Sequence, residues 1–148
     1  MKHITVGVAV ALGVVAAAGC WDEHCTELVV RYDGTRSGRL IARYEGPGSA
    51  GVQQSPNVQG PFDTAHPTGS LFAVAGSRSC ASPALDSDQQ WEAVAWLDVD
   101  FDSPDCAASL DTPTRLACEP EEGEPQARST FTQRAFGLTR VELVLMDP

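Results

Sequence analysis

Lysine is almost absent from this 148-residue chain, because Lys2 is the only one and the other nine basic residues are arginine. A phosphate-binding loop, a protein-kinase lysine, a Ser-x-x-Lys nucleophile and a Schiff base all require lysine, so the sequence beyond Lys2 excludes them. Acidic residues outnumber basic ones by 20 to 10, which gives a net charge of -10 and a pI near 4.5. Nucleic-acid binding needs clustered cations and is therefore excluded as a function class.

Helical periodicity and the common hydrolase motifs are also missing. No window keeps a period of 3.6 residues over three turns, and the chain has no Gly-x-Ser-x-Gly, Cys-x-x-Cys or His-x-x-x-His motif. A triad is assembled in space rather than in sequence. A small hydrolase that uses His66 is therefore kept as one alternative function.

Residues 1–19 have the pattern of a secretory signal peptide. Lys2 supplies a cationic head, an apolar run follows over residues 4–18, and no acidic residue precedes Asp22. The apolar run has 15 residues, which is shorter than the stretch of about 20 that spans a bilayer as a helix. The segment therefore predicts export rather than a permanent membrane span.

The end of this segment, Ala17-Ala18-Gly19-Cys20, resembles the lipobox of bacterial lipoproteins. The resemblance implies cleavage before Cys20, acylation of Cys20 and attachment to a membrane through the lipid, with residues 20–26 as a tether. More than one acyl chain makes such anchoring stable. By the same resemblance, Trp21 in place of an aspartate implies the outer membrane of the cell envelope.

Four cysteines remain after the acylated one, and an even number in an exported protein indicates two disulfide bonds. Their spacing allows three pairings. We expect Cys25–Cys80, which would join the lipidated end to the body of the domain, and Cys106–Cys118, which would close an acidic loop. A zinc site built from all four thiolates is the alternative.

Alternation with a period of two residues dominates the rest of the chain and predicts β-strands. The predicted strands cover residues 27–32, 39–45, 70–77, 91–101, 130–136 and 139–146. Their expected buried faces are Leu28, Val30 and Tyr32; Leu40, Ala42 and Tyr44; Trp91, Ala93, Ala95, Leu97, Val99 and Phe101; and Val141, Leu143 and Leu145. Turn residues between the first two strands and Gly137 between the last two predict two hairpins.

Two stretches lack this alternation and are predicted to be long loops. Residues 46–69 contain five glycines and four prolines, and residues 102–127 are acidic and contain proline. Short strands separated by turns are typical of β-sandwiches and small barrels. We therefore predict an all-β protein in which residues 27–148 form a single small antiparallel β-sandwich.

Three segments of this domain resemble transthyretin-like Greek-key β-sandwich domains of bacterial exported proteins. They are residues 69–75, residues 93–100 and the closing Val-x-Leu-x-Leu strand that begins at Val141. The resemblance implies a Greek-key sandwich with an acidic loop after one strand. The Asp-Gly-Asn-Gly loop that is usual in these domains is absent here.

The acidic cluster is the candidate site for chemistry. Residues 86–124 contain twelve acidic residues and one basic residue, and Asp98, Asp100, Asp102 and Asp105 lie within eight positions. Calcium takes six to eight oxygen ligands, and aspartate is a usual donor. An EF-hand is excluded, because Ser103 stands where its glycine is required and Ser109 where its bidentate glutamate is required. The four aspartates are candidate ligands of a looser calcium site, and the alternative is a solvated acidic face.

The four largest aromatic residues of the strands, Tyr32, Tyr44, Trp91 and Trp96, could form a carbohydrate- or peptide-binding platform, but we expect them in the core. We predict a non-enzymatic interaction or structural module with an acidic surface, anchored by lipid, without a cofactor and with a protein or glycan partner. A calcium-dependent binding module and the hydrolase are the alternatives.

Overall fold

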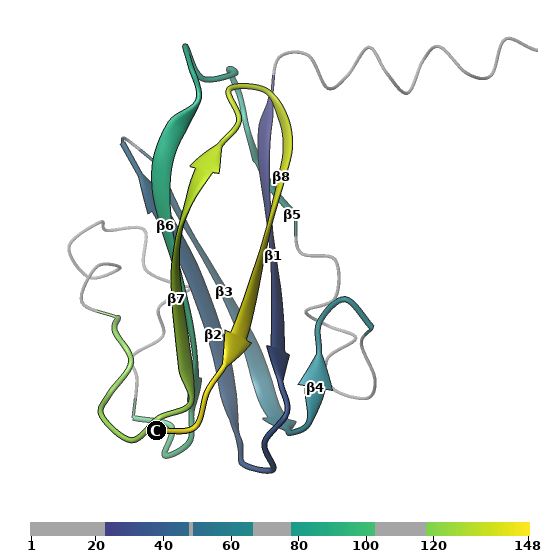
Figure 1. The fold of residues 1–148 in the computed structure, drawn as a ribbon, viewed down its shortest axis with the longest axis vertical. Helices are drawn as coiled ribbons and strands as arrows, with labels where there is room; N and C mark the ends of the chain where they lie inside the picture. Colours follow the sequence, from purple (N-terminus) through teal and green to yellow (C-terminus); the bar gives the residue numbers. More distant parts are fainter. Residues whose placement is uncertain (1–22, 48, 67–77, 103–117) are drawn as a thin grey trace, which may run out of the picture.

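The structure is a computed structural model that describes residues 23–47, 49–66, 78–102 and 118–148. All regular secondary structure in these ranges is β-strand, which confirms the predicted all-β class (Figure 1). The strands are β1 (His24–Tyr32), β2 (Ser37–Gly46), β3 (Ser49–Gln59), β4 (Phe62–Asp63), β5 (Arg78–Ala81), β6 (Gln89–Asp98), β7 (Gln126–Gln133) and β8 (Gly137–Leu145).

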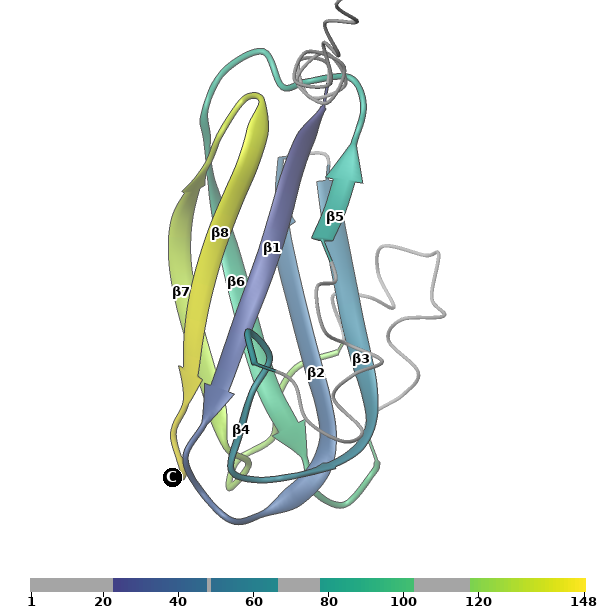
Figure 2. The ribbon, with the colours of Figure 1, turned by 90° about the vertical axis from the view of Figure 1, so that its right-hand side faces the viewer.

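The strands form two sheets that pack face to face, so the predicted β-sandwich is confirmed. In sheet A, β1 lies between β8 on one side and β4 and β5 on the other, and sheet B has the order β3-β2-β6-β7. Figure 2 looks onto sheet A with sheet B behind it. All pairs are antiparallel except β1 with β8, which is parallel, with Leu28 opposite Val141. The predicted antiparallel β-sandwich is confirmed, with β1 and β8 as the one parallel pair among the described strands.

The core lies between the two sheets and is built from alternate residues of the strands, as the period of two predicts. The predicted inward faces of β1, β2 and β8 are all buried there, together with those residues of β6 that precede Asp98. The core cluster is Leu28, Val30, Tyr32, Leu40, Ala42, Tyr44, Val58, Phe62, Trp91, Ala93, Ala95, Leu97, Val141, Leu143 and Leu145.

Both predicted hairpins are wrong. β1 and β2 belong to different sheets, as do β7 and β8, which share only the isolated bridge between Gln126 and Met146. In each case two strands with apolar inner faces are stacked across the core rather than paired edge to edge. The turn residues between them carry the chain from one sheet to the other.

The predicted loop over residues 46–69 is also wrong, because β3 and β4 occupy most of it. β3 pairs with β2 along its length, with a register shift where Leu40 stands. There the Leu40 amide donates to Ser55 Oγ at 2.9 Å, which replaces a ladder bond beside Pro56. Pro56 is compatible with a strand that pairs on one side only.

Smaller differences concern the ends of elements. β1 begins at His24, so the last residues of the predicted tether belong to the sheet, and β7 begins at Gln126, inside the predicted acidic loop. β6 ends at Asp98. Phe101, predicted in the core, is 49% exposed because its φ of 61° turns the chain away from the sheet. The predicted strand over residues 70–77 lies outside the described residues.

Candidate functional site

The candidate site lies at the end of the sandwich where β6 finishes and β7 begins. Antiparallel pairing places Trp96 of β6 opposite Gln126 of β7, and the Leu97 amide donates to the Pro125 carbonyl at 2.9 Å. These bonds bring the turn over residues 121–124 beside Asp98. Acidic residues that are about 25 positions apart in the sequence therefore meet at one place.

Asp98 is fully buried at this end. Its neighbour across the sheet is Arg39 of β2, whose Nε and Nη2 both donate to Asp98 Oδ2, at 3.2 and 2.7 Å. Asp98 Oδ1 is buried and, within the described residues, makes no hydrogen bond. One oxygen of this carboxylate is thus satisfied by an arginine and the other is unpartnered.

Glu124 is only 4% exposed and repeats this pattern. Its Oε2 accepts a hydrogen bond from the Glu121 amide at 2.8 Å, while its Oε1 is buried with no partner in the described part of the chain. Burial raises the pKa of Glu124, and the nearby charges of Asp98 and Asp100 raise it further. The turn is held by Arg36, which donates to the Gly123 carbonyl at 2.6 Å.

Asp100 and Asp102 are exposed and complete two overlapping groups of carboxylates. One oxygen each from Asp98, Asp100 and Glu124 lie within 4.8 Å of one another, and the same holds for Asp100, Asp102 and Glu121. The hydrogen bond between the side chains of Asp100 and Asp102 is the largest cause of a lowered pKa at Asp100 and a raised pKa at Asp102. These two carboxylates therefore compete for one proton.

The structure thus brings together three of the four predicted ligands, and Asp105 lies outside the described residues. Sequence reasoning missed Glu121 and Glu124 as members of the site. The run of acids from Glu119 to Glu124 was visible, but nothing in its spacing indicates which of them returns to Asp98. Only the pairing of β6 with β7 supplies that information.

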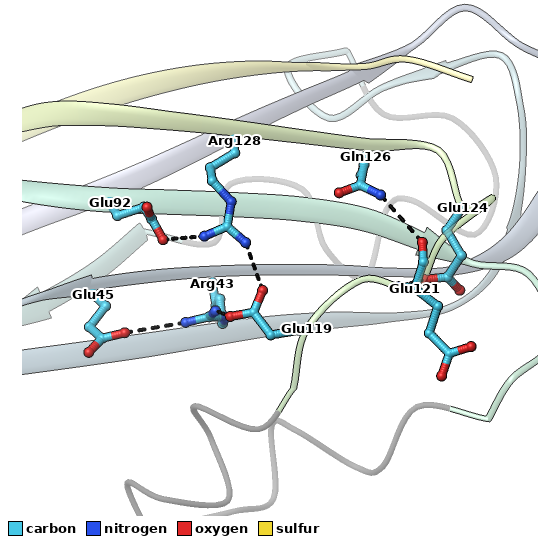
Figure 3. A network of polar contacts seen from close by, with 8 residues as sticks. All are labelled: Arg43, Glu45, Glu92, Glu119, Glu121, Glu124, Gln126 and Arg128. Atoms are coloured by element: carbon cyan, nitrogen blue, oxygen red, sulfur yellow. Dashed lines mark hydrogen bonds and ion pairs between the residues drawn. The ribbon is translucent and has the colours of Figure 1, made fainter. Parts of the chain in front are cut away.

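The segment that leads to the site crosses the outer face of sheet B (Figure 3). Glu119 lies between two arginines of that face: it accepts from Arg43 of β2 and, at 2.7 Å, from Arg128 of β7. Both arginines also contact strand carboxylates, Glu45 and Glu92 respectively. Beneath the segment lies a small buried cluster of Ile41, Val94, Trp96 and Cys118. These contacts fix residues 118 and 119 on the sheet and so restrict where the turn can lie.

The disulfide between Cys25 and Cys80 is confirmed and joins β1 to β5 at residues that lie directly opposite each other. It also excludes the four-thiolate zinc site, because two of the four sulfurs are bonded together. Cys118 is disulfide-bonded as well. The partner predicted for it, Cys106, lies outside the described residues.

The other candidate residues are distributed through the sandwich. His66 follows β4, its side chain is 85% exposed, and its Nδ1 lies 3.2 Å from Asp63 Oδ2; among the described residues no serine hydroxyl bonds to it. Tyr32, Tyr44, Trp91 and Trp96 are all buried. The expected place in the core between the sheets is confirmed for Tyr32, Tyr44 and Trp91, whereas Trp96 is buried in the smaller cluster on the outer face of sheet B.

Comparison with known proteins gives no relative from which a role could be transferred. No protein-family model, curated protein or solved structure matches the chain. Within the described residues, no helix has the length and apolar character needed to cross a bilayer.

Proposed function

We propose that this protein is a lipid-anchored protein of the bacterial cell envelope, acylated at Cys20 and sorted to the outer membrane. Its β-sandwich acts as a non-enzymatic interaction or structural module for a protein or glycan partner. The lipobox resemblance of residues 17–20 and the oxidised pair Cys25–Cys80 support export, because disulfide bonds persist in oxidising compartments.

The observation that supports the proposal is that the start of β1, which would follow the tether, and the acidic cluster lie at opposite ends of the sandwich. His24, the first residue of β1, packs edge-on against Trp91 near the start of β6, with ring centroids 5.8 Å apart. Asp98 is the last residue of β6, at the other end of that strand. Strands rise about 3.3 Å per residue, so the ten residues of β6 separate the two ends by roughly 30 Å.

The short tether limits how far the start of β1 can lie from an acylated Cys20. Glu23, where the described chain begins, is three residues from Cys20, and three residues span at most about 11 Å. Acylation of Cys20 would hold the start of β1 against the bilayer and direct the acidic end away from it. A surface held at that distance is suited to meeting a partner. The alternative of a calcium-dependent module rests on a separate observation, the unpartnered oxygens of Asp98 and Glu124.

Replacement of Cys20 by serine in a bacterial expression host tests the anchor. The unaltered protein should incorporate labelled fatty acid and give an intact mass that corresponds to an acylated chain beginning at Cys20. The Cys20→Ser variant should lose the label and accumulate as the uncleaved precursor, while Thr5→Ser, in the same segment, should behave like the unaltered protein. An unmodified mature chain that begins at another residue would overturn the proposal.

A further inference from the structure

Two buried carboxylate oxygens without hydrogen bonds mark one end of the sandwich. They are Asp98 Oδ1 and Glu124 Oε1, on side chains that are at least nine-tenths buried. An ionised oxygen that has been removed from water and given no donor is strongly destabilising. Within the described residues neither oxygen has a donor, so each is open to a positively charged ligand.

The two described arginines at this end, Arg36 and Arg39, already donate to other acceptors. Both nitrogens of Arg39 that reach Asp98 bind Oδ2, and the Arg36 guanidinium donates to a backbone carbonyl of the turn. Against these two positive charges stand five carboxylates: Asp98, Asp100, Asp102, Glu121 and Glu124. Among the described residues, the cluster therefore retains a net negative charge. Its two buried carboxylates are those of Asp98 and Glu124.

The separations of the carboxylate oxygens are compatible with one bound calcium ion. Oxygens from Asp98, Asp100 and Glu124 lie within 4.8 Å of one another. Calcium binds oxygen at 2.3–2.6 Å, so two of its ligands can be up to about 5 Å apart. Magnesium binds at 2.0–2.1 Å and allows at most about 4.2 Å. Oxygens no farther apart than this 4.8 Å bound can therefore share one calcium ion.

From these observations we infer that the end of the sandwich opposite the tether binds a calcium ion between Asp98, Asp100 and Glu124, with Asp102 and Glu121 at its mouth. The ion supplies the missing partner for Asp98 Oδ1 and Glu124 Oε1. Asp100 belongs to both groups of carboxylates and connects the buried ligands to the exposed pair. Bidentate carboxylates and water complete the six to eight oxygens that calcium takes.

The frame around the ion is fixed before it binds. The Leu97–Pro125 backbone bond holds the turn against β6, and the bond from the Glu121 amide to Glu124 Oε2 orients the glutamate. Arg39 performs the same task for Asp98. A ligand set held in this way loses little conformational entropy on binding.

Calcium titration of the full chain, purified in detergent and followed by calorimetry, tests the inference. We expect saturable binding of one ion, with magnesium bound at least about tenfold more weakly because of its shorter bonds. Glu124→Gln and Asp100→Asn should each weaken calcium binding by about tenfold or more, since ligand charge sets affinity. Asp100 is exposed, so its variant separates loss of a ligand from loss of folding.

Glu122→Gln is the matched control, because Glu122 is an exposed acid of the same turn and belongs to neither carboxylate group. This variant should leave the calcium affinity within about twofold, because it removes one exposed, screened charge that is not a ligand. Absence of saturable binding, or equal loss in the Glu122 and Glu124 variants, would overturn the inference. The measurement does not depend on acylation, so this failure would leave the anchoring proposal standing, and loss of the anchor would leave the calcium site standing.

Discussion

At the scale of single residues, the polar groups inside this sandwich connect the two sheets. Thr26 of β1 donates to Gln133 of β7 at 2.8 Å, and the Gln133 amide reaches back to the Cys25 carbonyl at 3.3 Å. Within sheet A, Tyr32 of β1 donates to Asp147, which follows β8, at 2.9 Å. Buried polar groups are normally satisfied in this way. Six buried side-chain atoms of the described residues have no partner, and the two of them that belong to carboxylates, on Asp98 and Glu124, both lie at the candidate site.

Tyr32→Phe tests one of these connections. The variant loses the bond to Asp147 and the weaker one from the Arg36 amide, so we expect a loss of about 1 kcal/mol in the free energy of unfolding at neutral pH. Burial raises the pKa of Tyr32, and the bond to Asp147 adds to this. A raised pKa in the folded state means stability that is complete below about pH 10, the unfolded value, and is lost as pH rises through the folded pKa.

Urea unfolding at several pH values from 7 to 11 checks both the loss of stability at neutral pH and its dependence on pH. The unaltered protein should lose stability above pH 10 more steeply than the Tyr32→Phe variant. Parallel curves at alkaline pH would contradict the assignment of that loss to Tyr32.

At the scale of elements, the disulfide holds a strand that few other contacts secure. β5 has four residues and pairs only with β1 among the described strands. The bond closes a loop with a sequence separation of 55, which in the chain-entropy account stabilises the fold by roughly 4 kcal/mol. Replacing Cys25 and Cys80 together by alanine should lower the free energy of unfolding by about 2–4 kcal/mol. Unfolding at an unchanged urea midpoint would show that the bond has no such role.

Gly38 couples the pairing of β2 and β6 to the candidate site. A Cβ added there would lie 2.5 Å from the carbonyl oxygen of Asp98, so Gly38→Ala forces the end of β6 to move. We expect a destabilisation of about 1–3 kcal/mol, as for other overpacked sites, together with weaker calcium binding. Ser37→Ala serves as the comparison, because Ser37 precedes Gly38 in β2 and is exposed. Thermal melts with and without calcium measure both variants, and a Gly38→Ala variant with unaltered affinity would contradict this coupling.

The strands and the orientation of their residues could be predicted from the sequence, whereas their partners could not. Alternation is local, so Leu28, Val30 and Tyr32 are marked as core residues whatever lies beside them. Stacked and hairpin strands satisfy the same alternation, so the sequence did not distinguish them. β3 was missed because polar residues such as Gln53 and Gln54 interrupt its pattern.

The same distinction applies to the candidate site. Asp98, Asp100 and Asp102 are close in the sequence, and their approach follows from the strand that ends among them. Glu124 joins them only because β7 pairs with β6. Local spacing therefore revealed one half of the ligand set, and the tertiary fold supplied the other half.

At the scale of the whole molecule, the sandwich has two unlike ends. β1 starts at one end of the sandwich, and the C-terminus and the end of β1 lie together at the other end (Figure 1). Ser87 precedes β6 at the tether end, and Thr35 lies in the turn before β2 at the acidic end; both are exposed. A protein anchored through Cys20 should therefore hold these two positions at different heights above a bilayer.

Energy transfer from each position to an acceptor dye on lipid headgroups measures this difference most directly. A donor is attached to Ser87→Cys or Thr35→Cys in the acylated protein, reconstituted in vesicles. The roughly 30 Å length of the strands predicts strong transfer from position 87 and much weaker transfer from position 35. Equal transfer from the two positions, or stronger transfer from position 35, would contradict an acidic end directed away from the membrane.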